Sequence, residues 1–159
     1  MCGIVAVTGY KKALPLLING LEKLEYRGYD SAGIAIINSE TNSISCNKAE
    51  GKLKNLVNSI NDENIPGTVG IGHTRWATHG KPEFKNAHPH IDGSGTIAVV
   101  QNGIIENFQD LKNKLEKEGI IFNSDTDTEV IPHLIKRELN TLSKLNLENN
   151  GSTLLVAVR

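Results

Sequence analysis

The chain has 159 residues, of which 38% are hydrophobic and 22% are charged, and its formal net charge is −1. These values suit one soluble globular domain, or most of one. A net charge near zero gives no electrostatic basis for binding nucleic acid or an anionic membrane, so neither is an expected partner. No apolar run approaches the ~20 residues that a membrane span needs. The two cysteines, Cys2 and Cys46, cannot build a disulfide framework, which favours a reducing, cytoplasmic setting.

Short apolar strands alternate with amphipathic helices in the first half of the chain. Residues 3–8 predict a strand buried on both faces, and residues 13–25 predict a helix whose leucines recur with a period near 3.6. Residues 32–37 and 43–48 predict two strands joined by a polar turn, as in a β-hairpin. Residues 53–60 predict a second, shorter helix.

A long irregular segment, residues 74–94, follows the strand expected at residues 68–72. It shows no credible periodicity, and a loop of that length in a compact domain is usually either functional or disordered. Its composition argues against disorder, because it holds an arginine, a tryptophan and three histidines: Arg75, Trp76, His79, His88 and His90. The segment is therefore expected to be functional.

The same region raises the question of a metal site. With His73 included, four of the five histidines lie within eighteen residues, as zinc ligands often do. No cysteine lies nearby, however, and the histidines lack the spacing of a helical ligand pair. We therefore expect no metal. The chain also lacks a dinucleotide fingerprint and a phosphate-binding loop, so no cofactor is expected.

Helices dominate the rest of the chain after a strand expected at residues 96–100. Asn107 is the expected N-cap of a helix that ends at a glycine, and residues 120–122 predict a short strand. Residues 126–128 are expected to begin another helix, and residues 153–157 are expected to begin a further short element. Strands with little strict alternation, interleaved with helices, indicate an α/β fold in which helices cover sheets.

Cys2 directly follows the initiator methionine, which is an unusual place for a reactive thiol. Removal of Met1 would leave the thiol and a free α-amino group on the same residue. An α-amino group is partly unprotonated near neutral pH, so it can act as a base for the adjacent sulfur nucleophile. The alternative is an incidental cysteine at a frayed terminus.

Four further residues could serve thiol chemistry on an amino-acid amide. Asn102 and Gly103 can offer a side-chain N–H and an unobstructed backbone N–H to an oxyanion, although Asn-Gly is also a common hairpin turn. Arg75 could pair with a carboxylate, and Asp127 could hold an ammonium group. A surface arginine and a helix-capping aspartate are the alternatives for these two.

Six segments together resemble the class II glutamine amidotransferases, which are N-terminal-nucleophile hydrolases, and among them the glutaminase domains of the glucosamine-6-phosphate synthase family. The segments follow the family's order and are residues 1–5, 24–34, 72–80, 86–90, 102–107 and 124–129. Related amidophosphoribosyltransferases and asparagine synthetases fit the second and third segments less well. The resemblance implies a four-layer αββα sandwich of two mainly antiparallel sheets.

The resemblance also implies roles around the nucleophile. Cys2 would attack the side-chain amide of glutamine to form a γ-glutamyl thioester, with its own α-amine acting as general base through a water molecule. Asn102 and Gly103 would form the oxyanion hole, and Arg27 would help to position the nucleophile. The products would be glutamate and ammonia.

A second group of residues would hold the glutamine. By resemblance, Arg75 would bind the α-carboxylate with help from Thr78 and His79, and Asp127 would bind the α-ammonium group. Trp76 would belong to a loop that closes over the substrate.

Two features depart from the family's pattern. Gln101 stands where the family usually has a histidine, and glutamine cannot become cationic. The family's glutaminase domain continues past residue 159, so residues 1–159 would be an incomplete domain, truncated on its C-terminal side and without sugar-isomerase domains. Fructose 6-phosphate would then be used only by those absent domains, in a full-length enzyme expected to be a homo-oligomer. The alternatives are an inactive or non-enzymatic fragment, a related class II amidotransferase and a metal-binding module.

Overall fold

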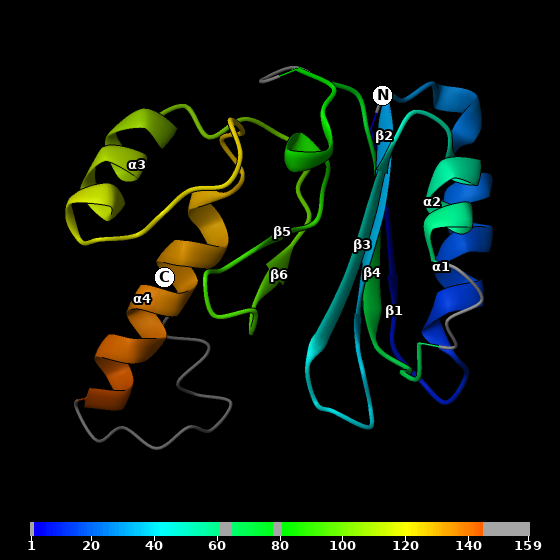
Figure 1. Cartoon of the computed structure of the whole chain (residues 1–159), viewed down its shortest axis with the longest axis horizontal. Helices are drawn as coiled ribbons and strands as arrows, with labels where there is room; N and C mark the ends of the chain where they lie inside the picture. The colour runs from blue at the N-terminus through cyan, green and yellow to red at the C-terminus, as the bar shows by residue number, and fades with distance from the viewer. Residues whose placement is uncertain (1, 61–64, 78–80, 145–159) are drawn as a thin grey trace.

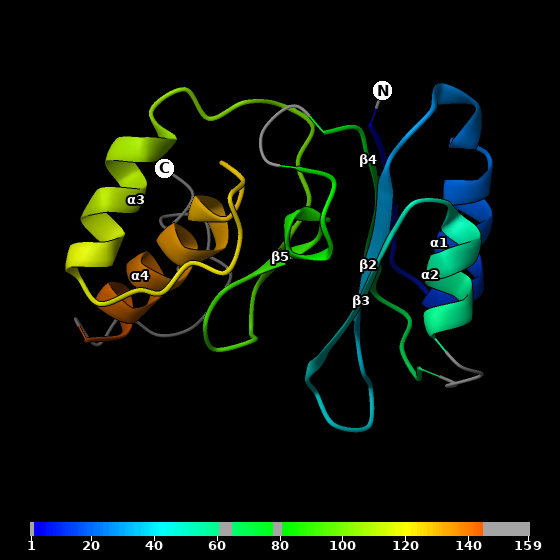
Figure 2. The same cartoon turned by 45° about the horizontal axis from the view of Figure 1, so that its top comes forward.

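A computed structural model describes residues 2–60, 65–77 and 81–144. These residues form four layers in the order helix, sheet, sheet and helix, which confirms the expected αββα arrangement (Figure 1). The same layering is visible when the molecule is turned (Figure 2). Within the described ranges, no helix combines the length and apolar character needed to cross a membrane.

The first sheet has four antiparallel strands: β1 (Gly3–Val7), β2 (Ser31–Ile37), β3 (Ile44–Glu50) and β4 (Gly70–Arg75). Their order across the sheet is β1-β4-β2-β3. The predicted hairpin is confirmed, because β2 pairs with β3 and Ile37 lies opposite Ile44. The turn is closed by Asn38, whose Oδ1 accepts backbone hydrogen bonds from Glu40 (2.9 Å) and Thr41 (3.1 Å). β2 is buried along almost its whole length, as its continuous apolar sequence predicts.

The sequence predicted that β1 is buried on both faces. In the structure, its residues alternate between more and less buried positions. Ile4 remains 41% exposed, whereas Val5 packs against the first helix. The reason is its place at the edge of the sheet, where only one face is well covered. An apolar run therefore does not distinguish an edge strand from a central one.

Two helices, α1 (Ala13–Glu22) and α2 (Leu53–Ser59), cover the outer face of this sheet (Figure 1). The predicted leucine stripe is confirmed, since Leu17 and Leu21 are fully buried against strand residues such as Ile34. Helix α1 ends at Glu22, earlier than predicted, and a short 3-10 helix, Glu25–Arg27, follows it. The main hydrophobic core lies between these two α-helices and the first sheet, and it holds the sheet rigidly in place.

The second sheet consists, among the described residues, of β5 (His90–Ile91) and β6 (Ala98–Val99). Two further helices, α3 (Phe108–Lys117) and α4 (Val130–Lys144), lie on its far side (Figure 1). Pro132 lies in the first turn of α4. Backbone N–H groups in a first turn make no intrahelical hydrogen bond, so a proline there costs none.

Several boundaries in this half differ from the sequence prediction. β4 runs on to Arg75 because its pairing with β2 continues to that residue, so the irregular segment starts later. Residues 120–122 form no strand, and Ile121 is 78% exposed. Asn107 occupies the N-cap of α3, but its side chain makes no capping hydrogen bond. Residues 153–157 lie outside the described ranges.

The two sheets meet where β2 passes beneath the segment that leads into β5. A Cβ atom at Gly33 would lie 2.1 Å from the carbonyl oxygen of His88, so only glycine permits this approach. Lys48 of β3 adds a hydrogen bond of 3.0 Å to the carbonyl oxygen of Ala87. Residues 87–88 are thus held against the first sheet by one close backbone approach and one side-chain hydrogen bond.

Candidate active site

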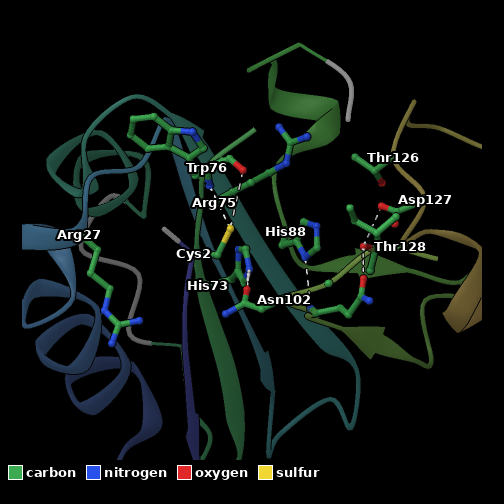
Figure 3. Close-up of a pocket in the computed structure, with 13 residues that line it drawn as sticks. Cys2, Arg27, His73, Arg75, Trp76, His88, Asn102, Thr126, Asp127 and Thr128 are labelled. Carbon is green, nitrogen blue, oxygen red and sulfur yellow. Dashed lines mark hydrogen bonds between the residues drawn. The ribbon is translucent and has the colours of Figure 1, made fainter. Parts of the chain in front are cut away.

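A cavity of about 610 Å³ lies where the adjoining ends of β1 and β4 face the segments after β6 and before α4 (Figure 3). Its lining residues are Cys2, Arg27, His73, Arg75, Trp76, His88, Gln101, Asn102, Gly103, Ile104, Thr126, Asp127 and Thr128. All the predicted site residues that the structure describes are in this set. The predicted substrate residues Thr78 and His79 lie outside the described residues.

Cys2 is placed by the pairing of β1 with β4, in which Gly3 lies opposite Thr74. This register brings the thiol beside the residue that follows β4. The backbone N–H of Trp76 donates a hydrogen bond to Cys2 Sγ at 3.2 Å, and the carbonyl oxygen of Trp76 lies 3.7 Å from the same sulfur (Figure 3). The two backbone groups of Trp76 therefore fix the position of the sulfur at the cavity.

Asn102 is oriented by a buried histidine. His73 Nε2 lies 2.7 Å from Asn102 Oδ1 (Figure 3). Burial lowers the pKa of His73 to about 4, so the ring is neutral at pH 7 and its Nε2–H can donate. The amide oxygen of Asn102 is thereby engaged, and its NH₂ group is left for a ligand. This is the orientation that an oxyanion donor needs.

Three of the clustered histidines pack against one another and form a histidine stack. The His73 and His88 rings are stacked with centroids 4.3 Å apart, and the His90 ring meets His88 edge-on at 4.6 Å. Two of these rings also contact residues that line the cavity. His88 Nδ1 accepts the Gln101 N–H at 3.4 Å, and His90 Nε2 lies 2.9 Å from Thr126 Oγ1. No cluster of three histidine, cysteine or acidic residues suited to a metal occurs within the described ranges.

The expected anchors for an amino acid's two charged ends are both buried. Arg75 is 4% exposed, and its guanidinium lies 3.5 Å from the carbonyl oxygen of Lys81 and 4.0 Å from the Asp30 carboxylate. Asp127 is 5% exposed, and its Oδ2 accepts the Ile105 N–H at 2.7 Å. The cavity that Cys2 lines is therefore also lined by a buried arginine and a buried aspartate.

Arg27 and Trp76 are arranged differently from the other site residues. The guanidinium of Arg27 lies 5.7 Å above the ring of Tyr26, and Arg27 Nε donates to the hydroxyl of Tyr26 at 3.3 Å. In Figure 3 it lies on the opposite side of Cys2 from Asp127. The Trp76 indole is half exposed and covers Gly28, where a Cβ atom would approach the ring to 3.0 Å.

Sequence reasoning missed the residues that hold the Asp127 segment in place. Thr128 Oγ1 donates to Gln101 Oε1 at 2.8 Å, so Gln101 serves as a link between the two segments. Glu129 accepts the backbone N–H groups of Asn123 (2.8 Å) and Ser124 (2.7 Å). Burial alone would raise the pKa of Glu129, but hydrogen bonds from these backbone groups and from the Ser124 hydroxyl, with His133 Nε2 3.6 Å from the carboxylate, lower it to about 2. In the sequence, Thr126 and Glu129 form a Thr-x-x-Glu pattern before an apolar run. This pattern predicts the start of a helix, but it does not predict which groups Glu129 binds.

Comparison with protein families supports the resemblance. A family model described as a glutamine amidotransferase domain matches residues 73–152. The chain is 59% identical over 135 residues to glutamine–fructose-6-phosphate aminotransferase [isomerizing] of Thermosynechococcus vestitus, covering 85% of this chain and 21% of that protein. The protein of the same name from Pyrococcus horikoshii is 56% identical over 139 residues, covering 87% of this chain and 23% of that protein. The chain thus spans less than a quarter of these curated relatives.

Solved structures share the fold at lower sequence identity. A structure described as the allosteric regulatory enzyme of purine biosynthesis matches with a TM-score of 0.73 and 30% identity, covering 91% of this chain and 33% of that one. Glutamine phosphoribosylpyrophosphate amidotransferase from B. subtilis gives a TM-score of 0.71 and 29% identity, with the same coverage of 91% and 33%. The fold is therefore one that glutamine amidotransferases use.

Proposed function

We propose that this chain, which belongs to the glutamine amidotransferase domain family, hydrolyses the side-chain amide of glutamine to glutamate and ammonia. The observation that carries the proposal is the convergence of four groups on one cavity: a thiol, an oriented amide donor, a buried cation and a buried anion. A thiol amidase that acts on a free amino acid requires all four.

In the proposed reaction, the sulfur of Cys2 bonds to the amide carbon of glutamine. Removal of Met1 would free the α-amine of Cys2, which takes the thiol proton through a water molecule. The amide NH₂ of Asn102 and the N–H of Gly103 stabilise the oxyanion. The C–N bond then breaks, the leaving nitrogen gains a proton and departs as ammonia, and water hydrolyses the γ-glutamyl thioester to glutamate.

Substrate selection would follow from the two charged side chains that line the cavity with the thiol. Arg75 is proposed to bind the α-carboxylate, and Asp127 is proposed to bind the α-ammonium group. The half-exposed Trp76 would cover the bound substrate, and Arg27 would approach the nucleophile from the other side. Thr78 and His79 remain predictions for the carboxylate end.

The role of the ammonia is a further proposal, drawn from the relatives. Their name describes them as isomerising aminotransferases that act on glutamine and fructose 6-phosphate. We infer that this chain corresponds to the first part of their glutaminase domain, and that sugar-isomerase domains would use the ammonia. A cytoplasmic location and assembly as a homo-oligomer are expected for such an enzyme and belong to the same proposal.

The proposal is tested by measuring ammonia and glutamate released from glutamine by the chain after removal of Met1, verified by intact mass. We expect release that Cys2→Ala abolishes and that Cys46→Ala leaves unchanged, because Cys46 lies on β3 outside the cavity. Asparagine, one methylene shorter, should be a much poorer substrate. A processed and folded chain that releases no ammonia would show the proposal to be wrong.

A further inference from the structure

We propose that Asp30 is a positioning residue that holds the backbone of residues 75–77, and through it both the Cys2 thiol and the Arg75 guanidinium. The inference rests on the proposed function for its kinetic consequence, but its effect on the thiol can be measured without glutamine. Asp30 does not line the cavity, and it would touch neither substrate nor reacting atoms.

The contacts of Asp30 bracket one residue of the site. Its backbone N–H donates to the carbonyl oxygen of Arg75 at 2.7 Å, and its carboxylate Oδ2 accepts the N–H of Ala77 at 2.5 Å. Its other carboxylate oxygen lies 4.0 Å from Arg75 Nη1. The residue enclosed between these contacts is Trp76, whose N–H and carbonyl group both face Cys2 Sγ.

Asp30 is itself fixed by the first sheet. Its carbonyl oxygen accepts the N–H of Gly51 at 2.7 Å, and the next residue, Ser31, begins β2 and pairs with Arg75. The preceding residue, Tyr29, accepts the N–H of Leu53 at 2.6 Å through its hydroxyl oxygen. A rigid frame therefore supports the carboxylate, and the geometry of residues 75–77 follows that frame.

The hydrogen bond to Ala77 is the part of this arrangement that a side-chain substitution can isolate. Asp30→Asn and Asp30→Ala remove the same negative charge, but asparagine keeps an acceptor oxygen for the Ala77 N–H. The loss of the charge affects the thiol equally in both variants. Any difference in Cys2 reactivity between them is therefore due to the hydrogen bond to Ala77.

The experiment uses the full chain in a Cys46→Ala background, so that Cys2 is the only thiol. The rate of Cys2 alkylation by iodoacetamide at pH 7 should be about fivefold lower in Asp30→Ala than in Asp30→Asn, the scale of one hydrogen bond between uncharged groups. The KM for glutamine should rise in Asp30→Ala and recover in part in Asp30→Asn, because Arg75 is held by the same segment. A merely structural role would lower the folded fraction and kcat but leave KM unchanged.

Asp92→Ala is the matched control. Asp92 likewise accepts backbone N–H groups through its carboxylate, from Ser94, Thr96 and Ile97, but it is more deeply buried than Asp30 and lies outside the cavity. We expect it to lower stability without changing alkylation. If Asp30→Ala does not fold, Asp30→Ser, whose side chain is one bond shorter than asparagine at the acceptor, takes its place. Equal alkylation and equal KM in the folded variants would overturn the inference. Altered alkylation in a chain without glutaminase activity would support it and refute the proposed function.

Discussion

His73 Nε2 lies 2.7 Å from Asn102 Oδ1, and this contact fixes which end of the Asn102 amide faces the cavity. Without it, the amide could rotate and present its oxygen to the developing oxyanion. The neutral state of His73 follows from its burial, which lowers its pKa to about 4. A buried histidine thus acts on the proposed reaction through its neighbour and not by moving a proton itself.

Replacing His73 tests this relationship. His73→Leu removes the donor and should lower kcat about 10- to 100-fold with little change in KM, because an oxyanion donor acts mainly in the transition state. His73→Gln can still donate from its terminal amide and should retain most of the activity. Steady-state kinetics of both variants provide the check, and equal losses in the two would contradict the orienting role.

Acid should destabilise the fold through the histidine stack. Burial lowers the pKa of His73 to about 4 and of His90 to about 3, and burial with the neighbouring histidines holds the pKa of His88 lower still. The unfolded chain therefore binds more protons below the ordinary value of 6.5. The stabilisation is complete above that pH and is lost as the pH falls, by about 1.4 kcal/mol per pH unit for each histidine.

Urea unfolding at pH 7, 6 and 5 measures this slope. His88→Gln removes one titrating group, so the loss of unfolding free energy between pH 6 and 5 should shrink by about a third. Glu129 contributes only at lower pH, since its pKa falls from 4.5 to about 2 and its stabilisation is lost between those values. A stability that does not change between pH 7 and 5 would contradict the neutral, buried state of the stack.

The approach of the two sheets at Gly33 gives a prediction about stability. Gly33→Ala would place Cβ 2.1 Å from the His88 carbonyl oxygen, a backbone atom that cannot rotate away. We expect a loss of about 2–4 kcal/mol in the free energy of unfolding. Gly93→Ala is the control, because a Cβ atom there meets nothing within 4 Å and should change stability little. Similar effects at both positions would count against this packing.

Arg75 is the test of substrate anchoring. Arg75→Ala should weaken glutamine binding by about 1.5–3 kcal/mol, the scale of one charged hydrogen-bond partner, and so raise KM. Arg75→Lys keeps the positive charge but loses the planar guanidinium that can form two parallel hydrogen bonds to a carboxylate. Its KM should therefore lie between those of the unsubstituted chain and Arg75→Ala. Arg137→Ala, which alters an arginine on α4 paired with Glu138, should leave KM unchanged. An unchanged KM in Arg75→Ala would remove it from the carboxylate site.

Local sequence patterns predicted the first sheet and its helices well, because hydrophobic period and turn chemistry act over short distances. The β2–β3 hairpin and the leucine stripe of α1 are examples. The exposure of β1 was missed, since an edge strand and a central strand can have the same apolar sequence. Residues 120–122 were wrongly expected to form a strand from a short apolar run alone.

The candidate site was predictable only as a set of residue types. Cys2, Asn102 and Asp127 line one cavity, as the resemblance to a known family implied. Their supports were not predictable, because the contact of Trp76 with Cys2 depends on strand register and the histidine stack depends on how two sheets meet. Such long-range contacts leave no periodic signal in the sequence.

The central claim is that Cys2 carries the γ-glutamyl group during turnover. Acid quenching of the processed chain in the presence of glutamine, followed by mass spectrometry of its N-terminal peptide, tests this directly. We predict an adduct of one γ-glutamyl group on Cys2 that disappears on hydroxylamine treatment and never forms in Cys2→Ala. Steady release of ammonia with no adduct on Cys2, or with the adduct on another residue, would contradict the assignment.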